Sequence, residues 1–472
     1  MRAPGHLSWA LPLAIGATLL SLDITEPWIG SFDANGAIFS TAARNTLRYG
    51  LAATRGGQVV NAGRVSPGDF HFYTHHPPGL PLTMAASFAL FGVAEWSARL
   101  VPILFALGAV ALLHRVARTL AGRRAACLAA LVFVLQPMVA FYGRMPDHEA
   151  PAVFFALALA ALYLAWQERG GRWRLAALAV VAFVGLWYAW AVFLVPWLLL
   201  AHAVVTRRRG AWRLLVPAAA AGLGAACVLA HAAWLEGGLG HLWDAFSHRV
   251  GSRASDRGGP GRFGLWDFAR RQGAYFWVAF SVAALAPCAA WLLGVGRAAG
   301  RGTLLVAALA AFGLLHVAIF KQGAYVHLYY QFYLAIPLAL AAGLALDGLL
   351  ARAGREPLWG AAALVLLAAI AAEGAWKLAR IHRATDYQAQ MLLVPHVLAT
   401  TEPSERVLLV WDHRASFRQL AFYADRNLEV VPDRATAARR QAADGFTRLL
   451  VVRRGTDGEL RVEPEPLRRE GR

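Results

Sequence analysis

The sequence predicts a polytopic membrane protein built from α-helices, with a small α/β domain at its C-terminal end. Three observations lead to this fold class. Of the 472 residues, 58% are hydrophobic and only 16% are charged, which is too apolar for a water-soluble domain of this size. Apolar runs of about 20 residues, the length that crosses a bilayer, recur along the chain. Clusters of Arg separate these runs, as in the cytoplasmic turns of membrane proteins.

The arginine clusters explain the net charge of +18. A charge of this size suits nucleic acid, but here it lies between apolar spans and therefore indicates topology first. An anionic lipid surface or a phosphate-bearing substrate is the second interpretation, and we expect no nucleic-acid partner. Cys127, Cys227 and Cys288 lie inside apolar runs, so neither a disulfide framework nor a metal cluster is indicated.

We expect about eleven membrane-spanning helices. Residues 7–22 form a signal-anchor helix that runs outward. Residues 78–92 are short and contain Pro81, so they are predicted as an interfacial or re-entrant helix, and every Arg-rich turn then falls on the cytoplasmic side. The other spans are residues 99–117, 125–141, 151–166, a hairpin within 175–205 that is interrupted by residues 187–190 and Pro196, and 214–233, 275–293, 304–320, 328–346 and 358–376.

The pattern predicts two domains. Residues 1–376 form the transmembrane domain, and residues 377–472 form an extracytoplasmic α/β domain. Buried strands are expected at residues 406–411, 428–431 and 448–452, with helices at 417–423 and 435–443 between them. The polar stretch 236–272 is predicted to be a functional or disordered loop.

Four polar patches lie on the predicted outer face. Ionisable groups at a membrane border are costly and are kept mainly where they do chemistry. The patches are Asp33 with Asn35, Arg44 and Arg48; Tyr73–Gly79 with His75 and His76; Arg144 with Asp147, His148 and Glu149; and Lys321–Tyr330 with His327, Tyr329 and Tyr330.

These residue types suit the transfer of a group from a phosphate. A carboxylate can take a proton from an acceptor hydroxyl, while Lys, Arg and His hold the leaving phosphate. Structural roles remain open: Asp33 as a helix N-cap, the two His as turn caps, Tyr329 and Tyr330 as an interfacial belt, and Lys321 as a snorkelling cation. Asp33 with Asp147 or Glu149 also offers oxygen ligands for a divalent cation, Mg²⁺ or Mn²⁺. No nucleotide-binding or zinc motif is present.

The same residues resemble a known family. The matching features are an acid after the first span, Ala43-Arg44-Asn45 with Gly50, His76-Pro77-Pro78, Phe91-Gly92 with Glu95 and Arg99, and the Arg-led acidic motif at Arg144. Together they resemble the GT-C glycosyltransferases that use polyprenyl-phosphate-linked sugars, in the branch of the protein O-mannosyltransferases and the lipid A aminoarabinose transferase (glycosyltransferase family 39). Residues 321–337 match more loosely. The chain departs from the pattern at Ala34, where many relatives have a second acid, at His76, where the aminoarabinose branch has Lys, and at residues 187–190, which lack a Lys.

The resemblance implies an inverting transfer with Asp33 as the general base. It places a second acid about five residues after Arg144, which is Glu149 rather than Asp147. The implied enzyme lies in the bacterial cytoplasmic membrane and works on its outer face. Its partners are membrane lipids, a polyprenyl-phosphate-linked donor and an acceptor that is a lipid, a polysaccharide or a protein. Two other classes remain open: a polyprenyl-lipid flippase without chemistry of its own, and a scaffold for envelope assembly.

Overall fold

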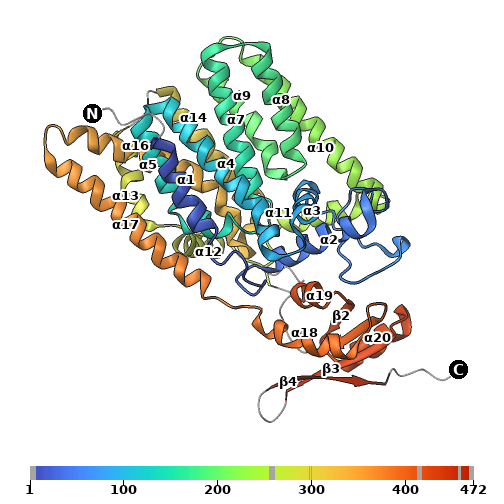
Figure 1. Cartoon of the computed structure of the whole chain (residues 1–472). Coiled ribbons are helices and arrows are strands. Elements are labelled where there is room, and N and C mark those ends of the chain that lie inside the picture. Colours follow the sequence, from blue (N-terminus) through green and yellow to red (C-terminus); the bar gives the residue numbers. More distant parts are fainter. Residues whose placement is uncertain are drawn as a thin grey trace. The chain divides into compact units, whose positions relative to one another are not determined.

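The computed structural model describes residues 7–254, 261–296, 298, 300–411, 417–454 and 459–466 (Figure 1). The chain forms two compact units. The first comprises Met1–Ile24, Thr74–Leu80 and Leu100–His382, and the second comprises Thr25–Tyr73, Pro81–Arg99 and Arg383–Arg472. Each unit is discontinuous in sequence and is described by itself. The predicted domain boundary after residue 376 stays a prediction.

The first unit is helical. Its α-helices are α1 (Leu7–Leu20), α4 (Glu95–Ala121, whose first five residues belong to the second unit), α5 (Arg123–Val134), α6 (Pro137–Tyr142), α7 (Glu149–Arg169), α8 (Arg172–Leu186), α9 (Leu194–Val205), α10 (Leu215–Glu236), α11 (Gly240–Val250), α12 (Leu265–Ala279), α13 (Leu285–Leu292), α14 (Gly300–Ile319), α15 (Lys321–Val326), α16 (Ala335–Arg352) and α17 (Pro357–His382). Short 3-10 turns are η2 (Trp190–Phe193), η3 (Ala211–Leu214), η4 (Val282–Ala284) and η5 (Leu328–Leu334).

Length and composition of these helices confirm the predicted class. Among the described residues, six helices are long and apolar enough to cross a membrane, or seven if the bent pair α12 and α13 is one broken span. Three shorter apolar helices accompany them, at Trp9–Leu20, Gly79–Phe91 and Trp190–Val205. The protein is therefore a helical membrane protein, and the number of about eleven spans stays a prediction.

The predicted span 125–141 is divided into α5 and α6. Pro137 has no N–H and disfavours helical geometry at the residue before it, so Gln136 is extended. The buried Gln136 side chain replaces part of the lost bonding. Its Nε2 donates to the Val132 carbonyl at 3.0 Å, and its Oε1 accepts from the Ser281 N–H at 2.9 Å. One amide thus serves the backbone at two helix ends.

The break between α12 and α13, a bend of 101°, is held by an ion pair on α17. Lys377 Nζ lies 2.6 Å from a Glu373 carboxylate oxygen and donates to the Phe280 carbonyl at 2.7 Å. Glu373 in turn accepts from Ser281 Oγ and from the Ala283 N–H, both at 2.8 Å. Helix ends leave backbone groups without partners, so the two side chains supply partners on both sides of the break.

Two predicted features of the first unit are corrected. The hairpin within 175–205 does break after Leu186, but Pro196 lies in the first turn of α9 and does not interrupt it, because a first-turn residue needs no intrahelical N–H partner. The stretch 236–272 is not wholly a loop, since its described residues form α11 and the beginning of α12. In α11 the apolar residues Leu242, Phe246 and Val250 recur every four positions, which is helical spacing.

The second unit joins the first outer loop to the C-terminal region. Its N-terminal part contains α2 (Ala34–Thr54), η1 (Pro67–Asp69) and most of α3 (Gly79–Phe91). Helix α2 is kinked at Gly50, whose φ of 79° suits glycine. The short apolar segment at residues 78–92 is thus a helix over Gly79–Phe91, as expected.

The C-terminal part of this unit is the predicted α/β fold. Strands β1 (Arg406–Val410), β2 (Asn427–Val431) and β3 (Arg448–Arg454) pair in parallel, and β4 (Leu460–Glu465) is antiparallel to β3, in the order β2-β1-β3-β4. Helices α19 (Arg418–Ala424) and α20 (Arg434–Asp444) follow the prediction. Strand β4 and helix α18 (Gln388–Thr400) were not predicted. Leu393 and Val397 of α18 pack in the core beside the sheet.

Candidate active site

Asp33 occupies the N-cap position of α2 but does not cap it. Its side chain makes no capping hydrogen bond, and its Oδ2 instead accepts from the Gly30 N–H at 2.8 Å. The preceding residue, Phe32, has a φ of 63°, a left-handed geometry that is strained for a bulky side chain. The loop therefore turns the Asp33 carboxylate back over residues 30–33, away from the helix it begins.

A buried arginine of the same unit faces this carboxylate. Arg99 is 1% exposed, and its Nη2 lies 3.7 Å from Asp33 Oδ2. Arg99 also donates to the Glu26 carbonyl, and its guanidinium lies over the Trp28 ring, 4.2 Å from the ring centroid. Gly36 allows Trp28 to lie this close to α2, since a Cβ there would be 2.4 Å from the indole. Asp33 is thus held between a backbone N–H and a fixed cation.

Residues from the C-terminal region of the same unit hold this loop. Tyr423 donates to Glu95 Oε1 at 2.5 Å and accepts from the Trp28 N–H at 2.8 Å. Burial, and next the hydrogen bond to Glu95, raise the pKa of Tyr423, so the hydroxyl stays a donor at neutral pH.

Arg44, which was predicted to bind the donor phosphate, and Arg48, from the same predicted patch, pair with the C-terminal region. Their guanidiniums lie 3.0 and 2.6 Å from the two carboxylate oxygens of Asp425. Arg44 also donates to the carbonyls of Phe422 and Ala62 at 2.8 and 2.9 Å. Burial lowers the pKa of Arg44 to about 10, against the opposing effect of Asp425. The Arg44 side chain therefore links α2 to the end of α19 through these hydrogen bonds and the ion pair.

In the first unit, two predicted histidines form one stacked pair. The rings of His76 and His148 lie 4.3 Å apart with an interplanar angle of 7°. His148 is buried and His76 is partly buried. Nδ1 of His148 lies 2.6 Å from the Tyr188 carbonyl, which can only accept, so Nδ1 carries the hydrogen and Nε2 is an acceptor in the neutral ring. Burial lowers the pKa of both imidazoles, and for His76 the neighbouring His148 lowers it further.

More basic groups surround this pair. His75, Arg249 and His327 are near enough to act electrostatically on His76. Arg249, in the last turn of α11, also donates to Gln322 Oε1 at 2.7 Å. Sequence reasoning missed Arg249, because the stretch around it was predicted to be a loop; the helical spacing of its apolar neighbours is the signal that identifies it.

A pair of buried acids follows His148. Asp147 accepts from the His148 N–H at 2.8 Å, and its carboxyl is within hydrogen-bonding reach of Glu149 at the first residue of α7. Both are buried, at 4% and 5% exposure. The two acids predicted as alternatives thus lie side by side, and Tyr333 is close enough to feel both charges.

The segment after α14 brings three of its four predicted residues together. The ring of His327 stacks on Tyr329 and Tyr330, with centroids 5.1 and 5.9 Å apart, and Tyr329 lies 6.4 Å from Tyr142. Lys321 is exposed at the start of α15, and within the described part of the chain it makes no ion pair. It therefore stays a prediction as a phosphate ligand.

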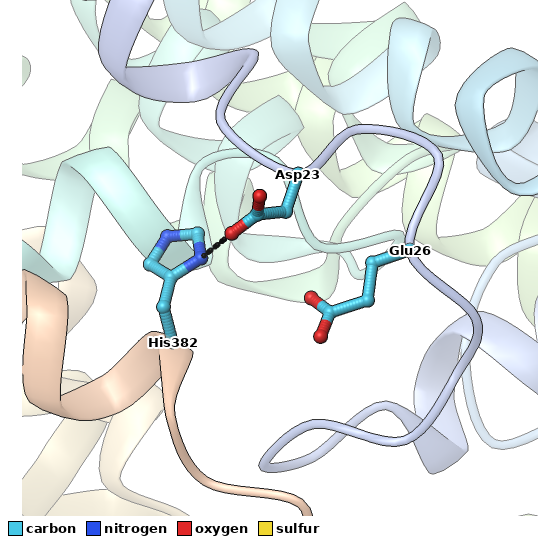
Figure 2. A group of neighbouring side chains, drawn as sticks. All are labelled: Asp23, Glu26 and His382. Carbon is cyan, nitrogen blue, oxygen red and sulfur yellow. Dashed lines mark hydrogen bonds and ion pairs between the residues drawn. The ribbon is translucent and has the colours of Figure 1, made fainter.

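Arg144 contacts an aromatic side chain next to the end of α17. Its guanidinium is 5.3 Å from the centroid of the Phe141 ring, which in turn packs edge-on against His382. His382 is the last residue of α17. Its Nδ1 points toward the Asp23 carboxylate (Figure 2), and the two atoms lie 3.0 Å apart. These contacts join the C-terminal ends of α1, α6 and α17.

The structure thus gives two groups of candidate residues. Asp33 and Arg99 lie in the second unit, and the imidazoles, Arg249 and the acid pair lie in the first. That these groups meet in one hollow stays a prediction, as does a divalent cation shared by Asp33 and the acid pair.

Comparison with known proteins agrees with this fold. Residues 75–234 match the family model described as dolichyl-phosphate-mannose-protein mannosyltransferase. No protein among the curated sequences matches the chain significantly. The crystal structure of ArnT from Cupriavidus metallidurans bound to undecaprenyl phosphate is similar at a TM-score of 0.68, with 15% identity, over 94% of this chain and 92% of that one.

Two further solved structures share the architecture. The archaeal oligosaccharyltransferase AglB from Archaeoglobus fulgidus matches at a TM-score of 0.61, with 13% identity, over 94% of this chain and 69% of that one. The arabinofuranosyltransferase AftD from mycobacteria matches at 0.52, with 17% identity, over 96% of this chain and 36% of that one. The predicted resemblance is confirmed: the chain has the fold of the GT-C membrane glycosyltransferases, and residues 75–234 match the mannosyltransferase family of that class.

Proposed function

We propose that this protein is a membrane glycosyltransferase that moves a sugar from a polyprenyl-phosphate-linked donor to an acceptor on the extracytoplasmic face of the bacterial cytoplasmic membrane. The match of residues 75–234 carries this proposal, because that segment contains the His76–His148 pair and the Asp147–Glu149 pair. The undecaprenyl phosphate in the similar ArnT structure supports a lipid-linked donor. The acceptor is a lipid, a polysaccharide or a protein.

In the proposed reaction, Asp33 takes the proton of the acceptor hydroxyl as its oxygen attacks the anomeric carbon. The bond to the donor phosphate breaks on the opposite side of the sugar, so the configuration is inverted. The Gly30 N–H and Arg99 hold the Asp33 carboxylate in one orientation, which is what a general base requires. In the proposal, a carboxylate of the Asp147–Glu149 pair assists Asp33 in this transfer.

The leaving phosphate gains negative charge as the bond breaks. In the proposal it is held by Arg249 and by the imidazoles of His75, His76, His148 and His327, with the hydroxyls of Tyr329 and Tyr330 as neutral donors. Burial lowers the pKa of His76 and of His148, so the negative charge of the phosphate would favour uptake of a proton by these two imidazoles. Arg44 is left out, because its guanidinium is already bonded to residues of its own unit.

Replacement of Asp33 by Asn tests the assignment of the base. Asn keeps the shape of the side chain and removes the proton acceptor, so we expect transfer to fall by two to four orders of magnitude, roughly the contribution of general base catalysis. The matched control is Asp69→Asn, the same change at an exposed site of the same unit. Turnover is measured with a polyprenyl-phosphate sugar in proteoliposomes, together with the yield of folded protein.

Two outcomes would overturn the proposal. Wild-type turnover in folded Asp33→Asn protein would remove Asp33 as the base. Movement of the lipid across the bilayer with its sugar–phosphate bond intact, and no transfer to any acceptor, would make the protein a flippase. The mass of the lipid that copurifies with the wild-type protein is a direct check on the donor class, since a polyprenyl phosphate is expected.

A further inference from the structure

A cavity lies in the first unit at the opposite end of the helices from the proposed active site. It has a volume of about 300 Å³ and is bounded by the last turns of α4 and α7, the region after α9, and the first turn of α14. Its polar lining is formed by Thr119, Gln167, Glu168, His202, Arg208 and Arg301, and its apolar lining by Leu120 and Leu164.

The length of helix α7 gives the distance between the cavity and the His76–His148 pair. Glu149 begins this helix beside the His76–His148 pair, and Glu168 lies at its other end in the wall of the cavity. At 1.5 Å per residue the two positions are about 28 Å apart, close to the thickness of the hydrocarbon core. The cavity therefore lies at the level of the lipid headgroups, on the side of the Arg-rich turns.

The wall of the cavity is held by a chain of hydrogen bonds. The side-chain amide of Gln167 donates to the Tyr163 hydroxyl, which lies 2.6 Å from Nδ1 of His202. Nε2 of His202 lies 2.8 Å from the Arg301 carbonyl, an obligate acceptor. Nε2 of His202 is therefore the donor there, and Nδ1 accepts from the tyrosine. These bonds use both nitrogens of the imidazole and fix the backbone of Arg301 against α7 and α9.

The charges facing the cavity are mainly positive. Both Arg208 and Arg301 are close enough to act electrostatically on the Tyr163 hydroxyl. Among the described residues neither guanidinium makes an ion pair, although both line the cavity. The lining contains two cations, Arg208 and Arg301, and one anion, the exposed Glu168. Its net charge is therefore +1. A partly apolar cavity with two arginines that lack a carboxylate partner selects an anion attached to an apolar body.

We propose that this cavity binds the phosphate of an anionic phospholipid. Basic pockets between membrane helices on the side of the positive turns are typical sites for such headgroups. The guanidiniums would bind the phosphate oxygens with paired N–H donors, and Thr119 and Gln167 add neutral donors. The acyl chains would leave past Leu120, which is partly exposed, toward the bilayer. The volume suits one glycerophosphate headgroup, since ligand cavities begin at about 300 Å³.

The test uses the full-length protein in phosphatidylcholine micelles. Phosphatidylglycerol is titrated in, and binding is followed by the rise in thermal midpoint and by the lipid retained on the intact protein in mass spectrometry. We expect Arg208→Gln and Arg301→Gln each to weaken binding about fivefold and the double variant about 25-fold, which corresponds to roughly one surface charge interaction per arginine. Arg209→Gln is the matched control, because the same charge is removed at an exposed neighbour that does not line the cavity.

Three results would overturn the proposal. Equal losses in all three single variants would show that only net charge matters. The same stabilisation by inorganic phosphate at equal concentration would replace the lipid with a free anion. No preference for phosphatidylglycerol over phosphatidylcholine would remove the site. Each variant must first reach the wild-type midpoint in phosphatidylcholine alone. If Arg301→Gln does not, Arg208→Gln decides the test, because no described residue is hydrogen-bonded to its side chain.

Discussion

Removal of one hydroxyl group should loosen the C-terminal region from the loop that carries Asp33. The change is Tyr423→Phe. In the wild-type protein this hydroxyl accepts from the Trp28 N–H at 2.8 Å and donates to the Glu95 carboxylate at 2.5 Å. Phenylalanine keeps the ring and its packing, so the variant isolates the two hydrogen bonds.

The expected cost follows from the nature of these bonds. A neutral hydrogen bond contributes about 1 kcal/mol, and one to a charged group contributes about 2 kcal/mol. Together they predict a loss of about 3 kcal/mol in the free energy of opening of this region. The control Tyr49→Phe removes the same group in the same unit, but among the described residues its hydroxyl has one hydrogen-bond partner, the Val65 N–H at 2.9 Å, so a loss of about 1 kcal/mol is expected.

Limited proteolysis of the full-length protein measures this difference. When reclosing is faster than cleavage, the cleavage rate follows the population of the open form. At 1.4 kcal/mol per factor of ten, the rate should rise on the order of 100-fold in Tyr423→Phe and about fivefold in Tyr49→Phe. Equal rates in the two variants, or a wild-type rate in Tyr423→Phe, would refute the reasoning.

The pH dependence provides a second check on the same bonds. Burial and the hydrogen bond to Glu95 raise the pKa of Tyr423 above its ordinary value of 10. The folded protein therefore keeps this hydroxyl protonated at a pH where the unfolded chain ionises it. The stabilisation is fully present below pH 10 and is lost as the pH rises through the folded pKa. The difference between wild type and Tyr423→Phe should therefore narrow above pH 10.

Three other variants test separate parts of the structure. Because burial lowers the pKa of His76, its contribution to stability is present above pH 6.5 and lost as the pH falls toward the folded pKa. His76→Phe, which keeps an aromatic ring on His148, should make the thermal midpoint less sensitive to acid between pH 7 and 5. Lys377→Met leaves Glu373 without its cation at the α12–α13 break, so we expect a loss of about 3–5 kcal/mol in denaturant unfolding, partly recovered when Glu373 is also replaced by Met. Asp425→Asn removes the charge between two arginines but tolerates the left-handed φ of 47°. Asp425→Asn should lower the free energy of unfolding by about 1 kcal/mol, and Asp425→Ala should lower it by roughly 1 kcal/mol more. The shift in thermal midpoint measures both losses.

The hydrophobic pattern predicts most of the elements because burial is what forms them. Apolar runs located the long helices, and the runs at residues 406–411 and 448–452 located central strands. Strand β4 was missed because Arg461 and Glu463 alternate with its apolar residues, as on an edge strand with one wet face. The break after α12 was missed for another reason. Its backbone is satisfied by Glu373 and Gln136, which lie 90 residues or more away in sequence, and no local pattern records such partners.

In the candidate site too, the sequence identified residues but not the groups that they contact. Residue type and position were enough to select His76 and His148, and the structure stacks their rings. Charge alone did not reveal what each cation binds. Arg44 was selected as a phosphate ligand, which stays a prediction, and its hydrogen bond to the Phe422 carbonyl, 378 residues further along the chain, has no local signal in the sequence. Arg249 was overlooked because polar residues hid the helical spacing of α11.

The Asp33 loop depends on the C-terminal region for its geometry. Phe32 holds a left-handed φ of 63°, and such a conformation persists only when surrounding contacts determine it. Two hydrogen bonds join this loop to the C-terminal region: the Trp28 N–H donates to the Tyr423 hydroxyl, and the Ile29 carbonyl accepts from the Tyr387 N–H at 3.1 Å. Tyr387 and Tyr423 therefore support, within the second unit, the loop that carries the proposed base. Loss of that support would release the strain at Phe32 and move the Asp33 carboxylate, even though no C-terminal residue is proposed to touch the substrate.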